Sequence, residues 1–271
     1  MRHSTLLTLA ALSLTGTAPG LSGPVLSVLA AQDFRWTGRV AAGKELEIKG
    51  VNGWIRATAA SGSEIEVTAV KRSRDDDPET VKVEVVEHDG GVTICAVYPT
   101  PRRSRHENEC APGDGGHMST EDNDVNVNFT VRVPAGVKFM GHTVNGDVEA
   151  DGLTADAHVG SVNGDVTVNT RGRAEASTVN GSVTATLGKA DWQGELEFST
   201  VNGGITLYLP DNLSTEVEAS TVNGDLESDF PLTLTGRFGP RRMRGTIGAG
   251  GRSLELSSVN GSIRLRKKSG A

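Results

Sequence analysis

The sequence predicts an all-β protein built as a β-solenoid, a β-helix-like stack of short strands, and three observations support this prediction. The tripeptide Val-Asn-Gly occurs seven times among 271 residues. Residues on both sides of each copy alternate between apolar and polar side chains, which is the period of a β-strand. The chain holds 34 glycines but only six Phe, three Trp and two Tyr, a composition that suits short strands and tight turns around a thin core.

The first 31 residues are expected to form a signal peptide. A short basic start is followed by apolar segments at residues 6–14 and 25–31, and the small residues at positions 28–31 fit a signal-peptidase site. Pro-Gly at 19–20 and Gly-Pro at 23–24 interrupt the segment, which argues against a membrane-spanning helix. We therefore expect an exported chain, periplasmic, cell-surface or secreted, without a transmembrane segment after cleavage.

Residues 32–135 are predicted to be a β-rich but less regular N-terminal part. Strands are expected within residues 38–70 and over residues 80–87, 91–97 and 125–133, because apolar and polar residues alternate there. Residues 136–271 are expected to form the repetitive solenoid, continuous with this N-terminal part.

The only two cysteines, Cys95 and Cys110, bracket a polar segment without periodicity. In an oxidising compartment such a pair most simply forms one disulfide, here tethering a polar loop over residues 95–124. The alternative is a metal site that adds His106 and His117, but no Cys-x-x-C pair supports it. We expect no bound metal and no cofactor.

The repeat has a clear internal pattern. From the second copy of Val-Asn-Gly onward, successive copies begin 18, 17, 22, 21 and 37 residues apart. The last spacing is close to two periods, which predicts one coil that has lost its motif. Ser or Thr precedes six of the seven copies, and an aliphatic residue follows two places after each glycine. The predicted structural turns are Asn52, Gly53, Asn145, Gly146, Asn163, Gly164, Asn180, Gly181, Asn202, Gly203, Asn223, Gly224, Asn260 and Gly261.

Asparagine and glycine both tolerate positive φ, so they suit a sharp turn between strands. Two architectures remain open at this point. The strands on either side of each turn could pair with each other in a meander sheet or a barrel of hairpins. Alternatively, each turn is a corner of a solenoid coil, and the near-constant repeat length favours this second arrangement.

Several segments resemble the bacterial putative-adhesin family of exported domains of unknown function. They are the opening Gly-Lys-Glu-Leu-Glu-Ile-Lys-Gly-Val-Asn-Gly-Trp-Ile-Arg from residue 43, the Thr-Val-Asn-Gly-Asp-Val repeats, and the closing segment from residue 245. The resemblance covers residues 37–267. It implies a repetitive β-solenoid in an exported bacterial protein, and no established activity.

Acidic residues recur at fixed places in the repeat. Glutamate stands three residues before the Ser/Thr position at Glu175, Glu197, Glu218 and Glu255, with Glu47 in the analogous place of the first repeat. Equivalent positions of neighbouring coils lie ~4.8 Å apart, so these carboxylates are expected to form a row. The row could bind Ca²⁺ weakly, but its spacing does not match calcium-binding repeats, and a solvated acidic face is the simpler interpretation.

No catalytic motif stands out in the sequence, which contains neither Gly-x-Ser-x-Gly nor His-Glu-x-x-His. The formal charge of −7 argues against a nucleic-acid binder. We therefore expect a non-enzymatic, adhesin-like structural or interaction module of the cell envelope, with an envelope protein or a glycan as its partner. The alternatives are a polysaccharide-acting enzyme on the same scaffold and an accessory protein of envelope-stress signalling.

Overall fold

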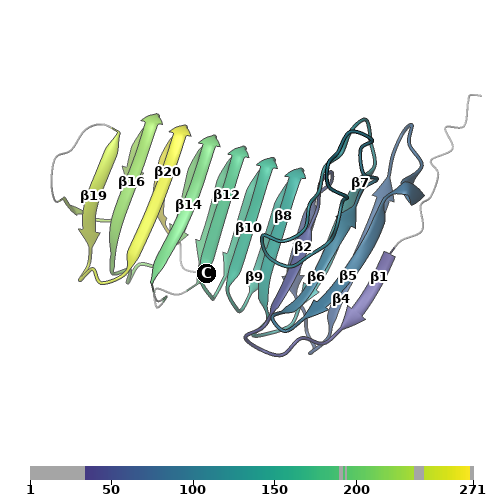
Figure 1. Ribbon diagram of the computed structural model, residues 1–271. Coiled ribbons are helices and arrows are strands. Elements are labelled where there is room, and N and C mark those ends of the chain that lie inside the picture. The colour runs from purple at the N-terminus through teal and green to yellow at the C-terminus, as the bar shows by residue number, and fades with distance from the viewer. Residues whose placement is uncertain (1–33, 189–191, 193, 235–240, 269–271) are drawn as a thin grey trace, which may run out of the picture.

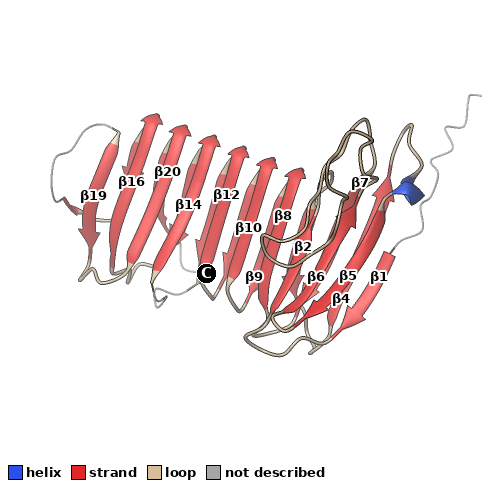
Figure 2. Ribbon diagram, in the orientation of Figure 1, coloured by secondary structure: helices blue, strands red, loops and turns tan. Residues whose placement is uncertain are grey.

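The computed structural model describes residues 34–188, 192, 194–234 and 241–268. Within these ranges nearly every regular element is a β-strand, and the only helix is the 3-10 turn η1 (Pro78–Thr80). The strands form two long sheets that face each other along the length of the molecule (Figures 1 and 2). The expected signal peptide lies outside the described residues.

One sheet has ten strands and the other has eleven. The ten-stranded sheet contains, in spatial order, β1 (Phe34–Gly38), β4 (Ile65–Arg72), β7 (Asn126–Val133), β3 (Ile55–Ala59), β9 (Val148–Leu153), β11 (Val166–Thr170), β13 (Val183–Leu187), β15 (Ile205–Leu209), β21 (Ile263–Lys267) and β17 (Leu226–Ser228). The eleven-stranded sheet contains β18 (Thr233–Leu234), β19 (Arg242–Ile247), β16 (Thr215–Asn223), β20 (Ser253–Asn260), β14 (Glu195–Asn202), β12 (Ala174–Asn180), β10 (Ala157–Asn163), β8 (Lys138–Asn145), β2 (Glu45–Lys49), β6 (Gly91–Val97) and β5 (Lys82–His88).

Each Val-Asn-Gly corner joins a strand of one sheet to a strand of the other. β10 pairs in parallel with β8 and β12, whereas β11, which follows it in the chain, pairs in parallel with β9 and β13. The strands flanking a corner therefore do not pair with each other, and the hairpin arrangement is wrong. The predicted solenoid is confirmed, with coils that have two long sides.

The core is a single layer of apolar side chains between the two sheets. One hydrophobic cluster extends from Leu46 in β2 to Leu265 in β21. Small side chains such as Ala150, Ala176 and Ala185 are at most 2% exposed, which keeps the two sheets close together. The alternating strand pattern thus places every second residue in this layer, as the sequence predicts.

The spatial order of the coils departs from chain order at both ends. The coil formed by β6 and β7 stacks on the outer side of the first coil, because β2 pairs with both β6 and β8. The coil of β20 and β21 lies between those of β14/β15 and β16/β17. Antiparallel strands flank the stack, with β1, β4 and β5 at the N-terminal end and β18 and β19 at the other.

The predicted coil without a motif between Val222 and Val259 is wrong. The chain there reverses direction, and β19 pairs antiparallel with β16. It then returns as β20, which inserts on the opposite edge of β16 in parallel. The 37 residues between the last two Val-Asn-Gly copies therefore contain this reversal of the chain. From the spacing alone, a reversal of this length cannot be told from two coils.

The corner glycines are required mainly by close packing. Only Gly53 and Gly146 have φ between 20° and 160°, at 118° and 156°, so the expectation of left-handed turns is wrong for the other five glycines and for every corner asparagine. A Cβ on any of the seven would lie 1.8–2.3 Å from a backbone carbonyl oxygen of the neighbouring coil. Six of these glycines thus stack on another corner glycine and Gly53 stacks on Val127, so no side chain fits between the coils.

Candidate interaction surfaces

A ladder of side-chain amides runs along the corners of the solenoid. In six of the seven corners, the asparagine Nδ2 donates to the Oδ1 of the asparagine in the adjoining coil, at 2.7–2.8 Å. The ladder connects all seven corners in the order Asn52, Asn145, Asn163, Asn180, Asn202, Asn260 and Asn223. The predicted turn residues therefore also bond one coil to the next.

A second ladder of hydroxyl groups is buried beneath the corners. The Ser or Thr hydroxyl before each of six Val-Asn-Gly copies donates to the carbonyl oxygen of the neighbouring coil's corner glycine, at 2.8–3.0 Å. These six side chains are only 4–7% exposed. A buried carbonyl without a partner costs free energy, so this hydroxyl satisfies a group that the close glycine stacking removes from water.

The valines of the corners form an exposed apolar row beside the amide ladder. Their side chains are 38–50% exposed in six of the seven copies: Val144, Val162, Val179, Val201, Val259 and Val222. Val51, in the first repeat, is 6% exposed. The corner edge therefore presents apolar side chains and amides in parallel lines.

A row of carboxylates crosses the outer face of the eleven-stranded sheet. Glu197 is in register with Glu255, and Glu255 with Glu218. Glu175 continues the row, since the next residue of β12, Ala176, is in register with Phe198 of β14. The predicted acidic row therefore exists, but in spatial order Glu255 precedes Glu218.

Arginines lie at both ends of this carboxylate row and leave its centre acidic. Arg173 forms an ion pair with Glu175 at 2.5 Å, and Arg242 and Arg244 both contact Glu218. The hydrogen bond from Arg242 lowers the pKa of Glu218. In contrast, desolvation, followed by the charges of Glu195, Glu197 and Glu218, raises the pKa of Glu255.

Two aspartates that directly follow corner glycines accept hydrogen bonds from the backbone of the next coil. Asp147 Oδ1 accepts from the N–H of Asp165 at 2.9 Å, and Asp165 Oδ1 accepts from the N–H of Ser182 at 2.8 Å. These carboxylates thus reinforce the stacking of coils. Within the described ranges, no group of three or more His, Cys, Asp and Glu side chains is placed to hold a metal ion.

The loop of residues 95–124 is attached by the Cys95–Cys110 disulfide, whose Cα atoms are 5.7 Å apart. It lies against the outer face of the eleven-stranded sheet, and Lys49 of β2 donates to its carbonyl oxygens at Ala111, Gly113 and Gly115. Both cysteines are bonded to each other, so they are not available as metal ligands beside His106 and His117.

Beneath this loop, Glu47 is buried in a polar network. Its side chain is 1% exposed and accepts hydrogen bonds from Thr93 Oγ1 at 2.8 Å and from the N–H of Gly113 at 3.1 Å. Lys49 Nζ lies 3.5 Å from its carboxylate. A buried carboxylate needs such partners, and the loop supplies one of them. Glu47 is therefore separate from the exposed carboxylate row that its sequence position predicts.

Two histidines adjoin this covered network. The rings of His142 in β8 and His158 in β10 are 5.0 Å apart. Burial and, to a smaller extent, the charge of the neighbouring His158 lower the pKa of His142 to about 4, and Glu47 only partly opposes them. His142 is therefore neutral near pH 7.

Tyr98 anchors the start of the loop to its end. Its hydroxyl donates to the carbonyl oxygen of Val125 at 2.6 Å, and burial raises the pKa of this hydroxyl to about 12. Asn108, in the middle of the loop, donates to the carbonyl oxygens of Tyr98 and Ser119 and accepts from the N–H of Ser119. The loop is thus fixed by specific hydrogen bonds in addition to the disulfide.

A protein-family model matches residues 43–266, from just before β2 into β21. The chain belongs to the Toastrack DUF4097 family. The family resemblance inferred from the repeats is thereby confirmed. The Toastrack match includes the loop of residues 95–124, the amide ladder and the carboxylate row.

Three solved structures are similar to this Toastrack chain. A putative cell adhesion protein from Clostridium sporogenes is 11% identical, with 88% of this chain and 100% of that chain covered and a TM-score of 0.45. A putative adhesin from Bacteroides fragilis is 12% identical, with 86% and 97% covered and a TM-score of 0.27. A putative adhesin from Parabacteroides distasonis is 10% identical, with 86% and 97% covered and a TM-score of 0.20. Among curated proteins, none matches this chain.

Three features of these surfaces are missed by sequence reasoning. The exposure of the corner valines, the burial of Glu47 and the His142–His158 contact all depend on which strands become neighbours. A signal for the amide ladder is present in the sequence, because an asparagine at the same place in every coil must meet its equivalents.

In the described part of the chain, no helix is long and apolar enough to cross a membrane.

Proposed function

We propose that this Toastrack chain is an exported, non-enzymatic, adhesin-like interaction module of the bacterial cell envelope. The observation that carries the proposal is the carboxylate row on the outer face of the eleven-stranded sheet. Glutamates directly opposite one another on neighbouring strands destabilise a sheet by repulsion. Glu197 and Glu255 occupy such positions, and desolvation, followed by the charges of Glu195, Glu197 and Glu218, raises the pKa of Glu255.

A partner with cationic groups would relieve this repulsion on binding. Complementary charge across an interface raises the association rate and selects the partner. Arg173 and Arg242 form ion pairs with the glutamates at the two ends of the row, so the unpaired acidic part of the face, among the described residues, is limited to the central strands. An envelope protein or a glycan that carries positive charges fits this face.

Export is supported by the N-terminal sequence and by the cysteines. Residues 1–31 have the composition of a signal peptide. Disulfides persist mainly in oxidising compartments, and Cys95 and Cys110 form one in this fold. The periplasm, the cell surface and the medium all satisfy this requirement.

The test is binding of immobilised protein to envelope fractions of the source bacterium, measured by surface plasmon resonance at low and high salt. The double variant Glu197→Gln/Glu255→Gln is expected to lose about tenfold in affinity, because it removes two charges from the centre of the row. The control Glu149→Gln/Asp151→Asn removes two charges from β9 on the opposite face and should bind like the unmodified protein.

Equal binding by both double variants, or no binding by the unmodified protein, would contradict the proposed face. Incubation with envelope polysaccharide provides a second readout. Release of reducing sugar that depends on Glu197 or Glu255 would instead favour an enzyme.

A further inference from the structure

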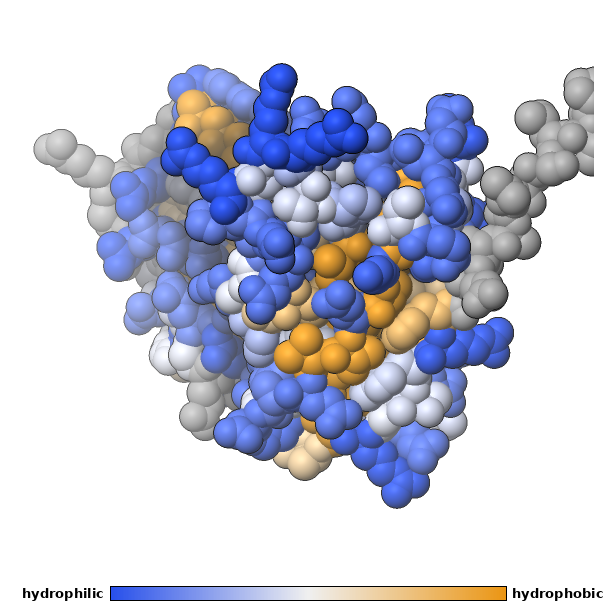
Figure 3. Space-filling model, turned by 45° about the vertical axis from the view of Figure 1, so that its right-hand side comes forward, coloured by the Kyte–Doolittle hydropathy of each residue, from blue (hydrophilic) through white to orange (hydrophobic). Residues whose placement is uncertain are grey.

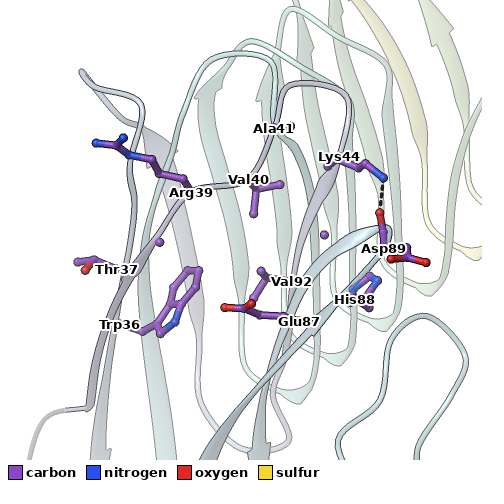
Figure 4. Close-up of a pocket in the computed structure, with 12 residues that line it drawn as sticks. Trp36, Thr37, Arg39, Val40, Ala41, Lys44, Glu87, His88, Asp89 and Val92 are labelled. Carbon is purple, nitrogen blue, oxygen red and sulfur yellow. Dashed lines mark hydrogen bonds between the residues drawn. The ribbon is translucent and has the colours of Figure 1, made fainter.

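The N-terminal end of the solenoid contains a cavity of about 330 Å³ between the terminal strands of the two sheets. Trp36 and Thr37 of β1 form one wall, Glu87 and His88 of β5 form the opposite wall, and Val40 and Val92 lie between them (Figure 4). β1 is the last strand of the ten-stranded sheet, and β5 is the last strand of the eleven-stranded sheet. The cavity therefore opens at the end of the core.

The surroundings of the cavity are partly apolar. Phe34, Val40, Val83 and Val85 pack against the core but are only partly buried. The space-filling view with this end turned forward shows an apolar patch surrounded by hydrophilic side chains (Figure 3). A ligand at this site would contact apolar groups as well as hydrogen-bonding groups.

Trp36 is held in place at the cavity wall by its own strand. The indole ring packs against Gly38, where a Cβ would lie 2.3 Å from the Cζ2 atom of the ring. The inward position of Gly38 therefore has no side chain, and the ring occupies that space. A ring fixed in this way provides a flat apolar surface without the cost of ordering it on binding.

Glu87 breaks the pattern of the core. It is in register with Val92, which is in register with Leu46, and both of those side chains are buried and apolar. Figure 4 shows the Glu87 carboxylate pointing across the cavity toward the indole of Trp36. Leu46, Val92 and Glu87 thus form a row that faces the core, and Glu87, at its exposed end, presents a hydrogen-bond acceptor opposite an aromatic ring.

The same carboxylate argues against a protein strand as the occupant. Inward-pointing charges on edge strands are a common device that prevents addition of a further strand. An apolar strand paired with β5 would bury the charge of Glu87. A small polar ligand with an apolar face avoids this cost.

The remaining charges favour a neutral ligand. Arg39 turns to Glu64, with which it forms an ion pair at 2.8 Å, and Lys44 donates to the carbonyl oxygen of Asp89. These two cations line the cavity together with the carboxylates Glu87 and Asp89, so its charges balance and favour an ion of neither sign. A saccharide has hydroxyl groups that can donate to Glu87 and a C–H face that can pack on Trp36.

We propose that this cavity binds a neutral saccharide unit, with Trp36 as the stacking surface and Glu87 as the hydrogen-bond acceptor. The site shares no residue with the carboxylate row, so it adds a second binding function at the end of the module. A cavity of this volume is at the small end of the range for ligand sites and suits one or two sugar rings.

The test is titration of the purified protein with chitotriose, cellotriose and maltotriose, followed by calorimetry and tryptophan fluorescence. At least one trisaccharide is expected to bind with a millimolar or lower Kd. Trp36→Ala should weaken that binding by about tenfold and Glu87→Gln by about threefold, because they remove the stacking surface and the charged acceptor. Trp54→Ala is the matched control, since Trp54 stacks with Arg56 on β3 and does not line the cavity.

Glu87→Gln keeps the size of the side chain, so it tests the site even if Trp36→Ala lowers the melting temperature. The variant Glu197→Gln/Glu255→Gln should bind the trisaccharide normally, which separates this site from the carboxylate row. Absence of binding by all three trisaccharides, equal binding by Trp36→Ala and the unmodified protein, or binding of tetramethylammonium in their place would overturn the proposal.

Discussion

In the middle of the solenoid, from β8 to β15, each coil repeats the polar contacts of the coil before it. Corner asparagines bond to asparagines, and buried hydroxyls bond to glycine carbonyls. At the N-terminal end, the corner at Asn52 meets different groups. Asn52 Nδ2 donates to the carbonyl of Asn123, and Asn128 Oδ1 accepts from the N–H of Trp54.

The difference shows how the stack is built and how it ends. A repeated corner offers the same donors and acceptors to the coils on both of its sides, so it can always be followed by another repeated corner. To end the stack, the chain uses antiparallel strands, a disulfide-tethered loop and unique side chains such as Tyr98 and Glu47. The cavity at Trp36 also lies in this non-repetitive part.

The largest effect is expected from a side chain placed in the glycine stack. Gly181→Ala would bring a Cβ to 2.0 Å from the carbonyl oxygen of Gly164. The coils would have to separate, so we expect a loss of about 3 kcal/mol or more in the free energy of unfolding, measured by urea denaturation. Gly62→Ala is the control, because no atom lies within 4 Å of that Cβ. Equal stability of the two variants would show that the coils are not closely stacked.

At the N-terminal end, removal of the disulfide is expected to cost about 3 kcal/mol through the greater entropy of the unfolded chain. The Cys95→Ala/Cys110→Ala variant should unfold at lower urea concentration. Its 95–124 loop should also be cleaved faster by trypsin, while the middle coils stay protected. Cleavage throughout the chain at similar rates would contradict the separation between the two regions.

The neutral state of His142 predicts a pH dependence at the boundary between the two regions, because β8 pairs with β2 of the N-terminal end. Its folded pKa of about 4 is below the ordinary value of about 6.5, so the unfolded chain takes up the proton first. Above pH ~6.5 this group has no effect on stability. As the pH falls from about 6.5 to about 4, stability should decrease by on the order of 1–2 kcal/mol, because the ring is half-buried and partly screened.

Urea midpoints measured at several pH values in this range provide the check. His142→Gln should reduce the decline, whereas His158→Gln, at a residue whose side chain is 46% exposed, should leave most of it. An unchanged pH profile in His142→Gln would assign the decline to other groups.

A smaller effect is expected in the buried hydroxyl ladder. Thr178→Val keeps the shape of the side chain but removes the donor to the carbonyl of Gly164, now 2.9 Å away. The expected loss is about 1 kcal/mol, the usual contribution of one hydrogen bond. Thr184→Val on the outer face of β13 is the matched control and should change stability less. If the two variants are equally stable, the ladder contributes nothing beyond backbone pairing.

The regular part of the fold could be predicted because its contacts are encoded in each repeat. Alternation places residues such as Val168 and Leu207 in the core, and the Asn-Gly corners identify the coils. The position of the last coil could not be predicted, because the corner at Asn260 is chemically equivalent to the others and can stack on any of them. The burial of Glu47 could not be predicted either, because it depends on the loop of residues 95–124, whose position is not indicated by any repeated motif.

The central claim is that the coils form one parallel stack in which β20 lies between β14 and β16. Ser199 is in register with Ser257, and Ser257 with Ser220, on the outer face. Neighbouring strands are ~4.8 Å apart, within reach of a disulfide, whereas strands two places apart are not. Mass spectrometry of non-reduced peptides should therefore find a cross-link in Ser199→Cys/Ser257→Cys and in Ser220→Cys/Ser257→Cys, and none in Ser199→Cys/Ser220→Cys. A cross-link only in Ser199→Cys/Ser220→Cys would contradict this order and place the coils in the order of the chain.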